Sequence, residues 1–396
     1  MAALIGLATH GGMGTIAPKV DRSGLESVGA VSAPQSVPPG VSISYPVTVP
    51  AGYSRASGLT APAGTGNVWY FAESSSQYEL FDYSVSSGTV KSYGVPHLAA
   101  LRSGVVTPIA IGNNGTVWVG INDSLVGIEP SSGAVSVVPL PTAPLVAQTV
   151  EAPPPTVPGL SAVDFEDVDS LAAESNGSLV IGRLYSSVLQ TYSPSTGKFG
   201  AVELPVDTVL TGNGADLAVA PNGVISVIVW ASAPGTIPAE EVAEWNGVQW
   251  VVEDVGCSAL NLVDVGATLL ASGRGCAASQ EMSAVVSGSA MTSLLPSGTS
   301  GVNAQVGPGI PVSQSETLLA TAVGAELVSP SSQVVETLSL GSILVGSGMG
   351  GGPAGALPSA TSVVPVTLGV MASNGQGLVW FLPAEGGESI GLMVVQ

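Results

Sequence analysis

Basic side chains are scarce in this chain of 396 residues. It has 8 Lys plus Arg against 28 Asp plus Glu, which gives a formal net charge of −20. A nucleic-acid-binding protein needs a basic surface to neutralise phosphates, so the sequence predicts no nucleic-acid partner. Anionic membrane surfaces would repel the same charge. No apolar run reaches the roughly 18 residues of a membrane-spanning helix, so no membrane insertion is expected.

Histidine and cysteine each occur only twice. The histidines are His10 and His97, so no histidine can serve as a general base later in the chain. The cysteines, Cys257 and Cys276, are too few for a structural zinc site. In an exported protein they favour one disulfide, and two unrelated thiols are the alternative. No leader is visible, but the weakly charged, Ser-, Thr- and Gly-rich composition favours an extracellular or cell-envelope location.

Turn-forming and β-branched residues are what the chain has in abundance. It contains 52 Gly and 30 Pro, and only 5% of its residues are aromatic. Apolar segments of strand length alternate with Asn-Gly and Ser-Gly pairs, which are typical turns of β-hairpins because they tolerate positive φ. The clearest unit, Pro108–Pro141, predicts four strands: Ile109–Ile111, Thr116–Gly120, Leu125–Ile128 and Ala134–Leu140.

This unit recurs about every 50 residues, which is typical of repeat architectures. The second strands of the successive copies begin near Val68, Val117, Leu179, Ile225, Leu269, Leu318 and Val379. A single four-stranded unit cannot bury both of its faces, and radial stacking of such units solves that problem. The sequence therefore predicts an all-β fold, a seven-bladed β-propeller of four-stranded antiparallel blades.

The two ends of the chain predict how the ring closes. The last copy ends near its third strand, and Val41–Pro50 resembles a fourth strand, so an N-terminal strand is expected to complete the last blade. Residues 1–36 then form a flexible N-terminal extension and residues 37–396 the propeller. Two inserts, Pro141–Pro158 and Gly346–Pro358, lengthen the repeat, and the second is expected to be a flexible linker.

The repeat resembles the blades of the virginiamycin B lyase family of seven-bladed propellers. The resemblance rests on Thr65–Glu73, Asn113–Gly120, Asn176–Leu184 and Ser193–Pro205. It implies magnesium and catalytic histidines with a glutamate near the top of the late blades. This chain has no histidine in those blades, so the resemblance supports the fold more than the activity.

Loops on one face of such a propeller gather around its central channel. They are the loops between the second and third strands of each blade and the connections between blades, and this face is called the loop face below. The candidate ligand-binding residues on it are Glu73, His97, Asp123, Arg183, Tyr185, Glu240, Arg274 and Glu281. They predict contact with a protein or a glycan, and no catalytic residue is assigned.

The acidic run Val163–Asp169 is the densest group of carboxylates on the loop face. Its carboxylate oxygens are of the kind that Ca²⁺ or Mg²⁺ binds. An extended segment would place Asp167 and Asp169 on one side. A solvated loop without an ion is the alternative reading. The candidate metal ligands are Asp164, Glu166, Asp167 and Asp169.

Cysteines and tryptophans complete the candidates. Cys257 and Cys276 fall in two loops of one blade, both on the loop face, which would suit a disulfide. The strand tryptophans Trp69, Trp118 and Trp380 are expected to pack between blades. Trp245 and Trp250 flank an Asn-Gly turn, where packing and stacking on a sugar both stay open.

Three functions agree with these features. The first is a non-catalytic extracellular propeller that binds a protein or glycan through its loop face and needs no cofactor. The second is a metal-dependent lyase or lactone hydrolase that uses the acidic run instead of histidines. The third is a structural subunit of a surface assembly.

Overall fold

The chain is described here as a computed structural model. The described residues are 15–16, 38–53, 55–74, 77–96, 107–142, 167–183, 186–210, 217–220, 222–231, 239–254, 258–265, 268–276, 280–287, 290–293, 305–313, 316–321, 324–328, 334–346, 361–366, 368–383 and 389–395. Within these ranges the chain is built from strands and turns and contains no helix. A search of the same residues for a helix able to cross a membrane finds none.

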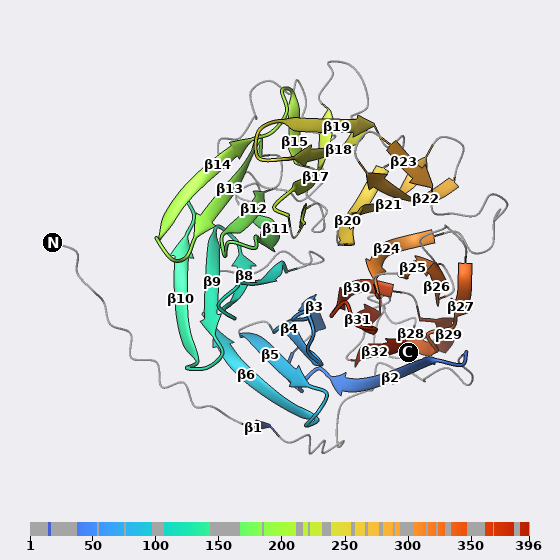
Figure 1. Cartoon of the computed structure of the whole chain (residues 1–396). Helices are drawn as coiled ribbons and strands as arrows, with labels where there is room; N and C mark the ends of the chain where they lie inside the picture. The colour runs from blue at the N-terminus through green and yellow to red at the C-terminus, as the bar shows by residue number, and fades with distance from the viewer. Residues whose placement is uncertain are drawn as a thin grey trace, which may run out of the picture.

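The strands form antiparallel sheets arranged around a centre as the blades of a propeller (Figure 1). Blade 1 consists of β3 (Arg55–Thr60), β4 (Asn67–Glu73), β5 (Tyr78–Ser84) and β6 (Thr89–Val95). Blade 2 consists of β7 (Ile109–Ile111), β8 (Val117–Ile121), β9 (Ser124–Glu129) and β10 (Ala134–Pro139). Blade 3 consists of β11 (Val168–Ala173), β12 (Leu179–Arg183), β13 (Val188–Ser193) and β14 (Lys198–Glu203).

The next three blades follow the same order. Blade 4 consists of β15 (Thr208–Leu210), β16 (Leu217–Val219), β17 (Ile225–Ala231), β18 (Ala239–Trp245) and β19 (Trp250–Asp254). Both β15 and β16 pair with β17, so the first strand of this blade is split. Blade 5 consists of β20 (Ser258–Val265), β21 (Thr268–Cys276), β22 (Gln280–Ser287) and β23 (Ala290–Ser293). Blade 6 consists of β24 (Gln305–Pro311), β25 (Thr317–Thr321), β26 (Gly324–Val328) and β27 (Val334–Leu338).

A composite sheet joins the two ends of the chain. Its strands are β30 (Leu368–Ser373), β31 (Leu378–Pro383), β32 (Ser389–Val395) and the N-terminal β2 (Val41–Thr48). Because β2 pairs antiparallel with β32, the expected N-terminal strand is present. Among the described residues, however, six blades rather than seven come from a continuous stretch of chain. The last repeat supplies only three strands, as expected, and β2 supplies the fourth. The predicted count of seven blades is therefore corrected to six blades plus this shared sheet.

The innermost strands contact one another around the centre. Each innermost strand contacts the next one around the ring, in the order β3, β7, β11, β16, β20, β24 and β30, and β30 in turn contacts β3. Of the expected N-terminal extension, the described part is only β1 (Thr15–Ile16), which pairs with β6 at the outer edge of blade 1. The boundary expected at residue 37 stays a prediction.

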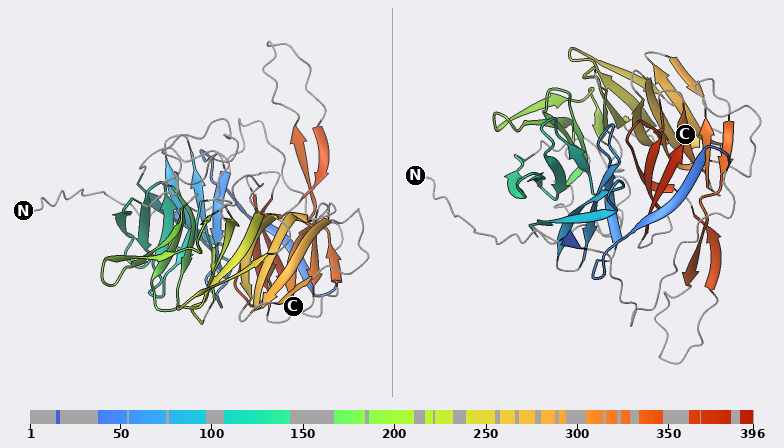
Figure 2. Two further views of the ribbon diagram at one scale, coloured as in Figure 1. Left: turned by 90° about the horizontal axis from the view of Figure 1, so that it is seen from above. Right: turned by 60° about the horizontal axis from the view of Figure 1, so that its bottom comes forward.

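One hairpin stands apart from the blades. It is formed by β28 (Ser342–Gly346) and β29 (Thr361–Pro365), and it projects from the ring between blade 6 and the composite sheet (Figure 2). The flexible linker expected at Gly346–Gly355 lies outside the described residues apart from Gly346, and it stays a prediction. The two strands that flank it were not expected, because they lie outside the repeat on which the strand prediction rests.

The Ser-Gly turns of the repeat are confirmed in blades 1, 2 and 3. In each turn the glycine N–H donates to the carbonyl oxygen four residues earlier, at 2.8 Å: Gly88 to Ser84, Gly133 to Glu129 and Gly197 to Ser193. The three glycines have φ of 64°, 70° and 66°. This left-handed conformation favours glycine, so the turn fixes the register of the two outer strands.

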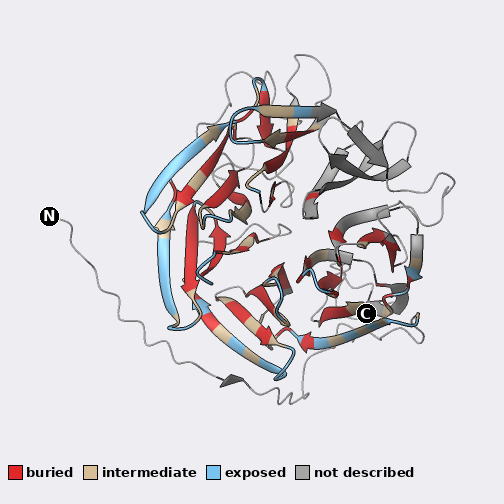
Figure 3. Cartoon of the chain, viewed as in Figure 1, coloured by how far each residue is buried: buried red, intermediate tan, exposed pale blue. Residues whose placement is uncertain are grey.

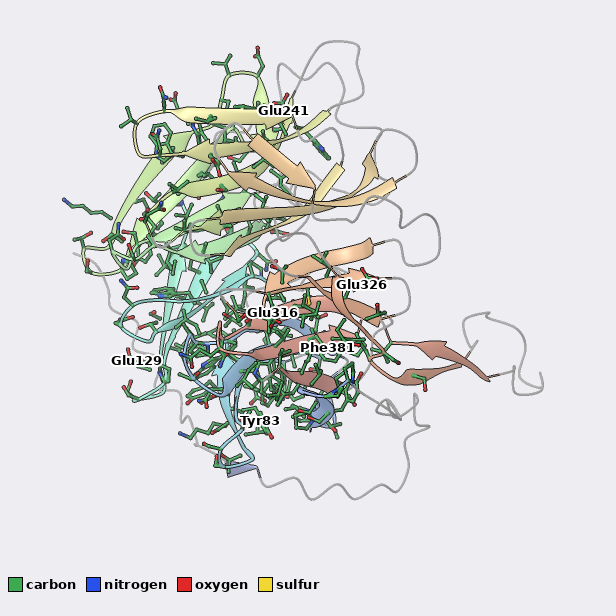
Figure 4. The ribbon with its side chains drawn as sticks, turned by 45° about the vertical axis from the view of Figure 1, so that its right-hand side comes forward. Tyr83, Glu129, Glu241, Glu316, Glu326 and Phe381 are labelled. Carbon is green, nitrogen blue, oxygen red and sulfur yellow. The ribbon has the colours of Figure 1, made fainter. Side chains whose placement is uncertain are left out.

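The core lies between neighbouring blades (Figure 3). Tyr83 of blade 1 and Phe381 of the composite sheet, both labelled in Figure 4, belong to two separate clusters on the two faces of that sheet. The strand tryptophans Trp69, Trp118 and Trp380 are all buried in clusters that join two blades, as predicted.

Candidate functional site

Buried polar side chains gather where blades 2 and 3 meet on the loop face. Below them lies an apolar core that includes Leu140, Ile181 and Tyr192. Above that core lie the turn between β8 and β9 and the beginning of β11. The group is called the polar cluster and comprises the buried Asp169, Ser170, Arg183, Ser186 and Gln190 together with the half-buried Asn122.

Arg183 is the central side chain of the polar cluster. It ends β12 and is only 1% exposed, although the same position of the repeat holds Ala72 in blade 1 and Ile121 in blade 2. Its Nη2 donates a hydrogen bond of 3.1 Å to the main-chain carbonyl of Pro141. A buried cation needs such acceptors, because the charge has lost its water.

Gln190 binds the same carbonyl from the neighbouring strand. It lies on β13 opposite Ile181, and its Nε2 donates to the Pro141 oxygen at 2.8 Å. Two side chains of blade 3 therefore bind the same peptide carbonyl, which belongs to the segment that follows the last strand of blade 2. This arrangement ties blade 3 to that segment through one main-chain carbonyl.

Three atoms on other side chains of the polar cluster have no hydrogen-bond partner among the described residues. They are Gln190 Oε1, Ser170 Oγ and Asn122 Nδ2. Ser170 Oγ lies against Gly182, where a β-carbon would come within 2.2 Å of it, so a larger residue at 182 would displace the hydroxyl. Buried polar atoms in native proteins almost always have a partner, either a protein group or an ordered water.

Main-chain hydrogen bonds hold the turn that contains Asn122. The Asn122 carbonyl accepts from Val168 N–H at 2.7 Å, and the Asp123 carbonyl accepts from Leu140 N–H at 2.9 Å. Asn122 has a φ of 50°, a left-handed conformation that asparagine tolerates better than most residues. The exposed Asp123 is thereby fixed at the rim of the polar cluster.

The connection from blade 3 to blade 4 forms the other side of the rim. Leu204 N–H donates to the Ser187 carbonyl at 2.9 Å, and Leu210 N–H donates to the Ser186 carbonyl at 3.1 Å. Between these anchors Val206 is 88% exposed and Asp207 is exposed as well. The rim thus offers an apolar side chain and carboxylates to solvent on a turn fixed at both ends.

The acidic run is only partly described. Asp167 is half-buried and Asp169 is buried, whereas Asp164 and Glu166 lie outside the described residues. A β-bulge between Val168 and Ser170 interrupts the regular alternation here. The expected placement of Asp167 and Asp169 on one side of an extended segment stays a prediction. No group of three His, Cys, Asp or Glu suited to a metal occurs in the described part of the chain. The Ca²⁺ or Mg²⁺ site stays a prediction.

The remaining candidates spread over other blades. Glu73 ends β4 and is half-buried. Glu240, Arg274 and Glu281 lie within β18, β21 and β22 rather than in loops, because these strands extend further than the sequence pattern indicates. His97 and Tyr185 lie outside the described residues. The structure therefore brings together only the candidates at blades 2 and 3, and the binding role of each stays a prediction.

The cysteine pair is only partly described as well. Cys276 is the last residue of β21, where its backbone pairs with Gln280 of β22. Cys257 lies outside the described residues, so the disulfide stays a prediction. Trp245 and Trp250 pack at 5.4 Å between ring centroids, and Trp250 Nε1 donates to the Glu203 carbonyl at 2.6 Å. These contacts favour the packing role expected for the two rings.

Gln190, Ser170 and Ser186 are members of the polar cluster that the sequence analysis missed. A signal was available for Gln190, because it is a polar residue at a core-facing position of the segment Val188–Ser193. Ser170 and Ser186 carried no such signal. Their burial depends on the bulge in β11 and on the turn between β12 and β13.

The fold defines a β-propeller protein, and comparison with solved structures agrees. The chain is similar to virginiamycin B lyase from Staphylococcus aureus, with a TM-score of 0.56, 9% identity and coverage of 90% of this chain and 100% of that one. It is also similar to the WD40 repeats of RRP9, with a TM-score of 0.57, 10% identity and coverage of 93% and 100%. YCF48 bound to D1 peptide matches with a TM-score of 0.50, 12% identity and coverage of 93% and 98%.

These likenesses show the propeller fold alone, because the identities are so low. No protein-family model matches the chain. No curated protein matches it in sequence either.

Proposed function

We propose that the chain is a non-catalytic extracellular propeller that binds a protein partner through its loop face at blades 2 and 3. The observation that carries the proposal is the polar cluster, in which Arg183 and Gln190 hold one peptide carbonyl next to an exposed rim.

The rim of the polar cluster suits a protein partner as well. Val206 is the most exposed large hydrophobic side chain among the described residues, and the exposed carboxylates of Asp123 and Asp207 lie on turns held by the same blades. Protein interfaces combine a small apolar contact with a polar rim in this way. A glycan would rather require an exposed aromatic platform, and the Trp250 indole is engaged with Glu203.

The structural neighbours include propellers that bind without chemistry as well as a lyase. One of them is YCF48 in complex with a peptide, and another is a WD40 repeat domain. A virginiamycin B lyase neighbour is described as catalytically inactive once a histidine is replaced by alanine. The present sequence has no histidine after His97, which weighs against the lyase alternative.

A matched pair of surface variants tests the proposal. The probe is an array of synthetic extended peptides, read with the labelled full chain. We expect Val206→Asp to lose most of the bound peptides, because it places a charge at the rim of the polar cluster. Val248→Asp should keep them, since Val248 is 83% exposed on the turn between β18 and β19, away from that rim.

A third variant tests the polar cluster itself. Gln190→Leu should lose the same peptides as Val206→Asp, whereas Gln376→Leu, which alters an exposed glutamine of the composite sheet, should not. Equal binding by Val206→Asp and Val248→Asp would contradict the proposed face. Turnover of a streptogramin-type lactone by the wild-type chain would contradict the non-catalytic role. Fractionation of the producing cells tests the extracellular location.

A further inference from the structure

The base of the β28–β29 hairpin is packed in the core, but its two strands pair with no other described strand. At its root Leu340 and Val366 are fully buried in the core between blade 6 and the composite sheet. Tyr45 Oη of β2 donates to the Leu340 carbonyl at 2.6 Å, and Val366 N–H donates to the Gly341 carbonyl at 3.1 Å. Beyond this root, β28 and β29 pair only with each other among the described strands (Figure 2).

Such a hairpin is marginally stable alone, because two strands in water lack a third strand or a packing partner. Its composition is also unusual for this chain. No Asp, Glu, Lys, Arg or His stands between Glu336 and Glu385, although the whole chain carries a net charge of −20. A second copy would therefore meet no ionisable side chain on the hairpin itself.

The register identifies which edge of the hairpin is free to pair. Hydrogen-bonded and non-hydrogen-bonded residue pairs alternate along an antiparallel ladder. Since Val366 donates to Gly341, the next pair, Ser342 with Pro365, is non-hydrogen-bonded, and so is Leu344 with Val363. The main-chain groups of such pairs point away from the hairpin, toward its two open edges.

The two open edges differ in one residue. On β29 the outward groups belong to Thr361, Val363 and Pro365, and proline has no N–H to donate. On β28 they belong to Ser342, Leu344 and Gly346, which all carry an N–H. Only the β28 edge offers an uninterrupted row of donors and acceptors.

We propose that the hairpin is a self-association arm that pairs β28 antiparallel with β28 of a second copy. Around a two-fold axis Leu344 then exchanges N–H···O=C bonds with its counterpart, and Ser342 pairs with Gly346 of the other copy. The result is a four-stranded sheet, the arrangement that a lone hairpin lacks. Isologous pairing of this kind is the commonest way in which two identical chains associate.

Proline substitution tests the β28 edge without breaking the hairpin. Leu344→Pro removes an outward N–H and no hydrogen bond between β28 and β29. Val363→Pro is the matched control, because it makes the same change at the β29 edge. In sedimentation velocity we expect twice the single-chain mass for the wild type and for Val363→Pro, and the single-chain mass for Leu344→Pro.

Salt dependence is a second measurement. Because each copy carries −20, screening should strengthen the dimer, so the fraction of dimer should rise with ionic strength. A wild-type chain that stays monomeric at all concentrations and salt levels overturns the proposal. So does a dimer that survives Leu344→Pro when thermal unfolding shows the variant to be folded. A monomer that binds neutral phosphatidylcholine vesicles would instead assign the arm to lipid.

Discussion

Two interfaces between neighbouring blades solve the same packing problem with different residues. At the seam, where the composite sheet meets blade 1, aromatic rings fill the core: Tyr70 stacks on Phe81 at 4.9 Å, and Trp380 meets Tyr83 edge-on at 5.6 Å. Between blades 2 and 3 the apolar core ends in the polar cluster, with a buried arginine at its centre.

The difference follows from what each interface must do. At the seam the two ends of the chain are joined, and burial of large rings gives the strong, non-directional attraction that this closure requires. The interface of blades 2 and 3 lies between consecutive repeats, so it can hold polar groups whose net contribution to stability is small. The buried rings at the seam thus stabilise the closed ring of blades, and the interface of blades 2 and 3 keeps polar groups that a partner could contact.

The largest effect should come from truncation at the seam. We expect Trp380→Ala to lower the free energy of unfolding by about 3–5 kcal/mol, because it removes a fully buried ring between the composite sheet and blade 1. Urea denaturation of the full chain measures this change. Trp380→Phe is the control and should lose far less, since it keeps a ring and removes an indole N–H that has no partner among the described residues. A loss of less than about 1 kcal/mol for the alanine variant would refute the role of the seam.

Truncation in the polar cluster should cost less. Arg183→Ala removes the charged donor to the Pro141 carbonyl, and we expect a loss of about 2 kcal/mol, within the range for hydrogen bonds to charged groups. Arg183→Met should lose less, because it keeps the length of the side chain in the packed core. The same denaturation experiment applies. If Arg183→Ala lowered the free energy of unfolding as much as Trp380→Ala does, the two interfaces would not differ in this respect.

Two tyrosines within the seam allow a finer comparison. Tyr53 Oη donates to Glu79 Oε2 at 2.5 Å, whereas Tyr70 Oη is buried without a partner among the described residues. We expect Tyr70→Phe to raise the unfolding free energy by about 1 kcal/mol and Tyr53→Phe to lower it by a similar amount. Thermal unfolding of both variants at neutral pH measures the two changes, and losses in both variants would show that the Tyr70 hydroxyl has a partner.

Alkaline pH should enlarge the effect at Tyr70. Burial and, to a lesser extent, the charge of Glu79 raise the pKa of Tyr70 above its ordinary value of 10.0. Above pH 10 the folded state therefore keeps a proton that the unfolded state loses. The contribution of Tyr70 to the free energy of unfolding of the wild type keeps its full value below pH 10 and falls as the pH rises further. The stability advantage of Tyr70→Phe should therefore grow above pH 10, and an advantage independent of pH would contradict this assignment.

The contrast between the interfaces also separates what the sequence predicts from what it does not. Tryptophans at the same position of three repeats predict interblade packing, and Trp69, Trp118 and Trp380 are buried as expected. The repeat cannot predict the polar cluster, because Arg183 becomes buried only when Pro141 and Gln190 of other strands surround it. Nor can it predict β28 and β29, which belong to no repeat.

The smallest effect concerns the turn at the rim of the polar cluster. Glycine accepts the left-handed φ of 50° at Asn122, so Asn122→Gly should stay within about 0.5 kcal/mol of the wild type. Alanine does not accept this conformation readily, so Asn122→Ala should cost about 1 kcal/mol in the same urea denaturation.

Asn122→Gly also sharpens the comparison with Tyr70. Both residues carry a buried polar atom without a described partner, but Tyr70 is sealed in the seam, whereas Asn122 is only half-buried on the loop face. If the Asn122 amide contacts a partner, Asn122→Gly should weaken binding in the peptide array while stability stays the same. Tyr70→Phe should change stability and leave binding intact. Equal binding by both variants would mean that the unmatched amide, like the unmatched hydroxyl, is a feature of packing alone.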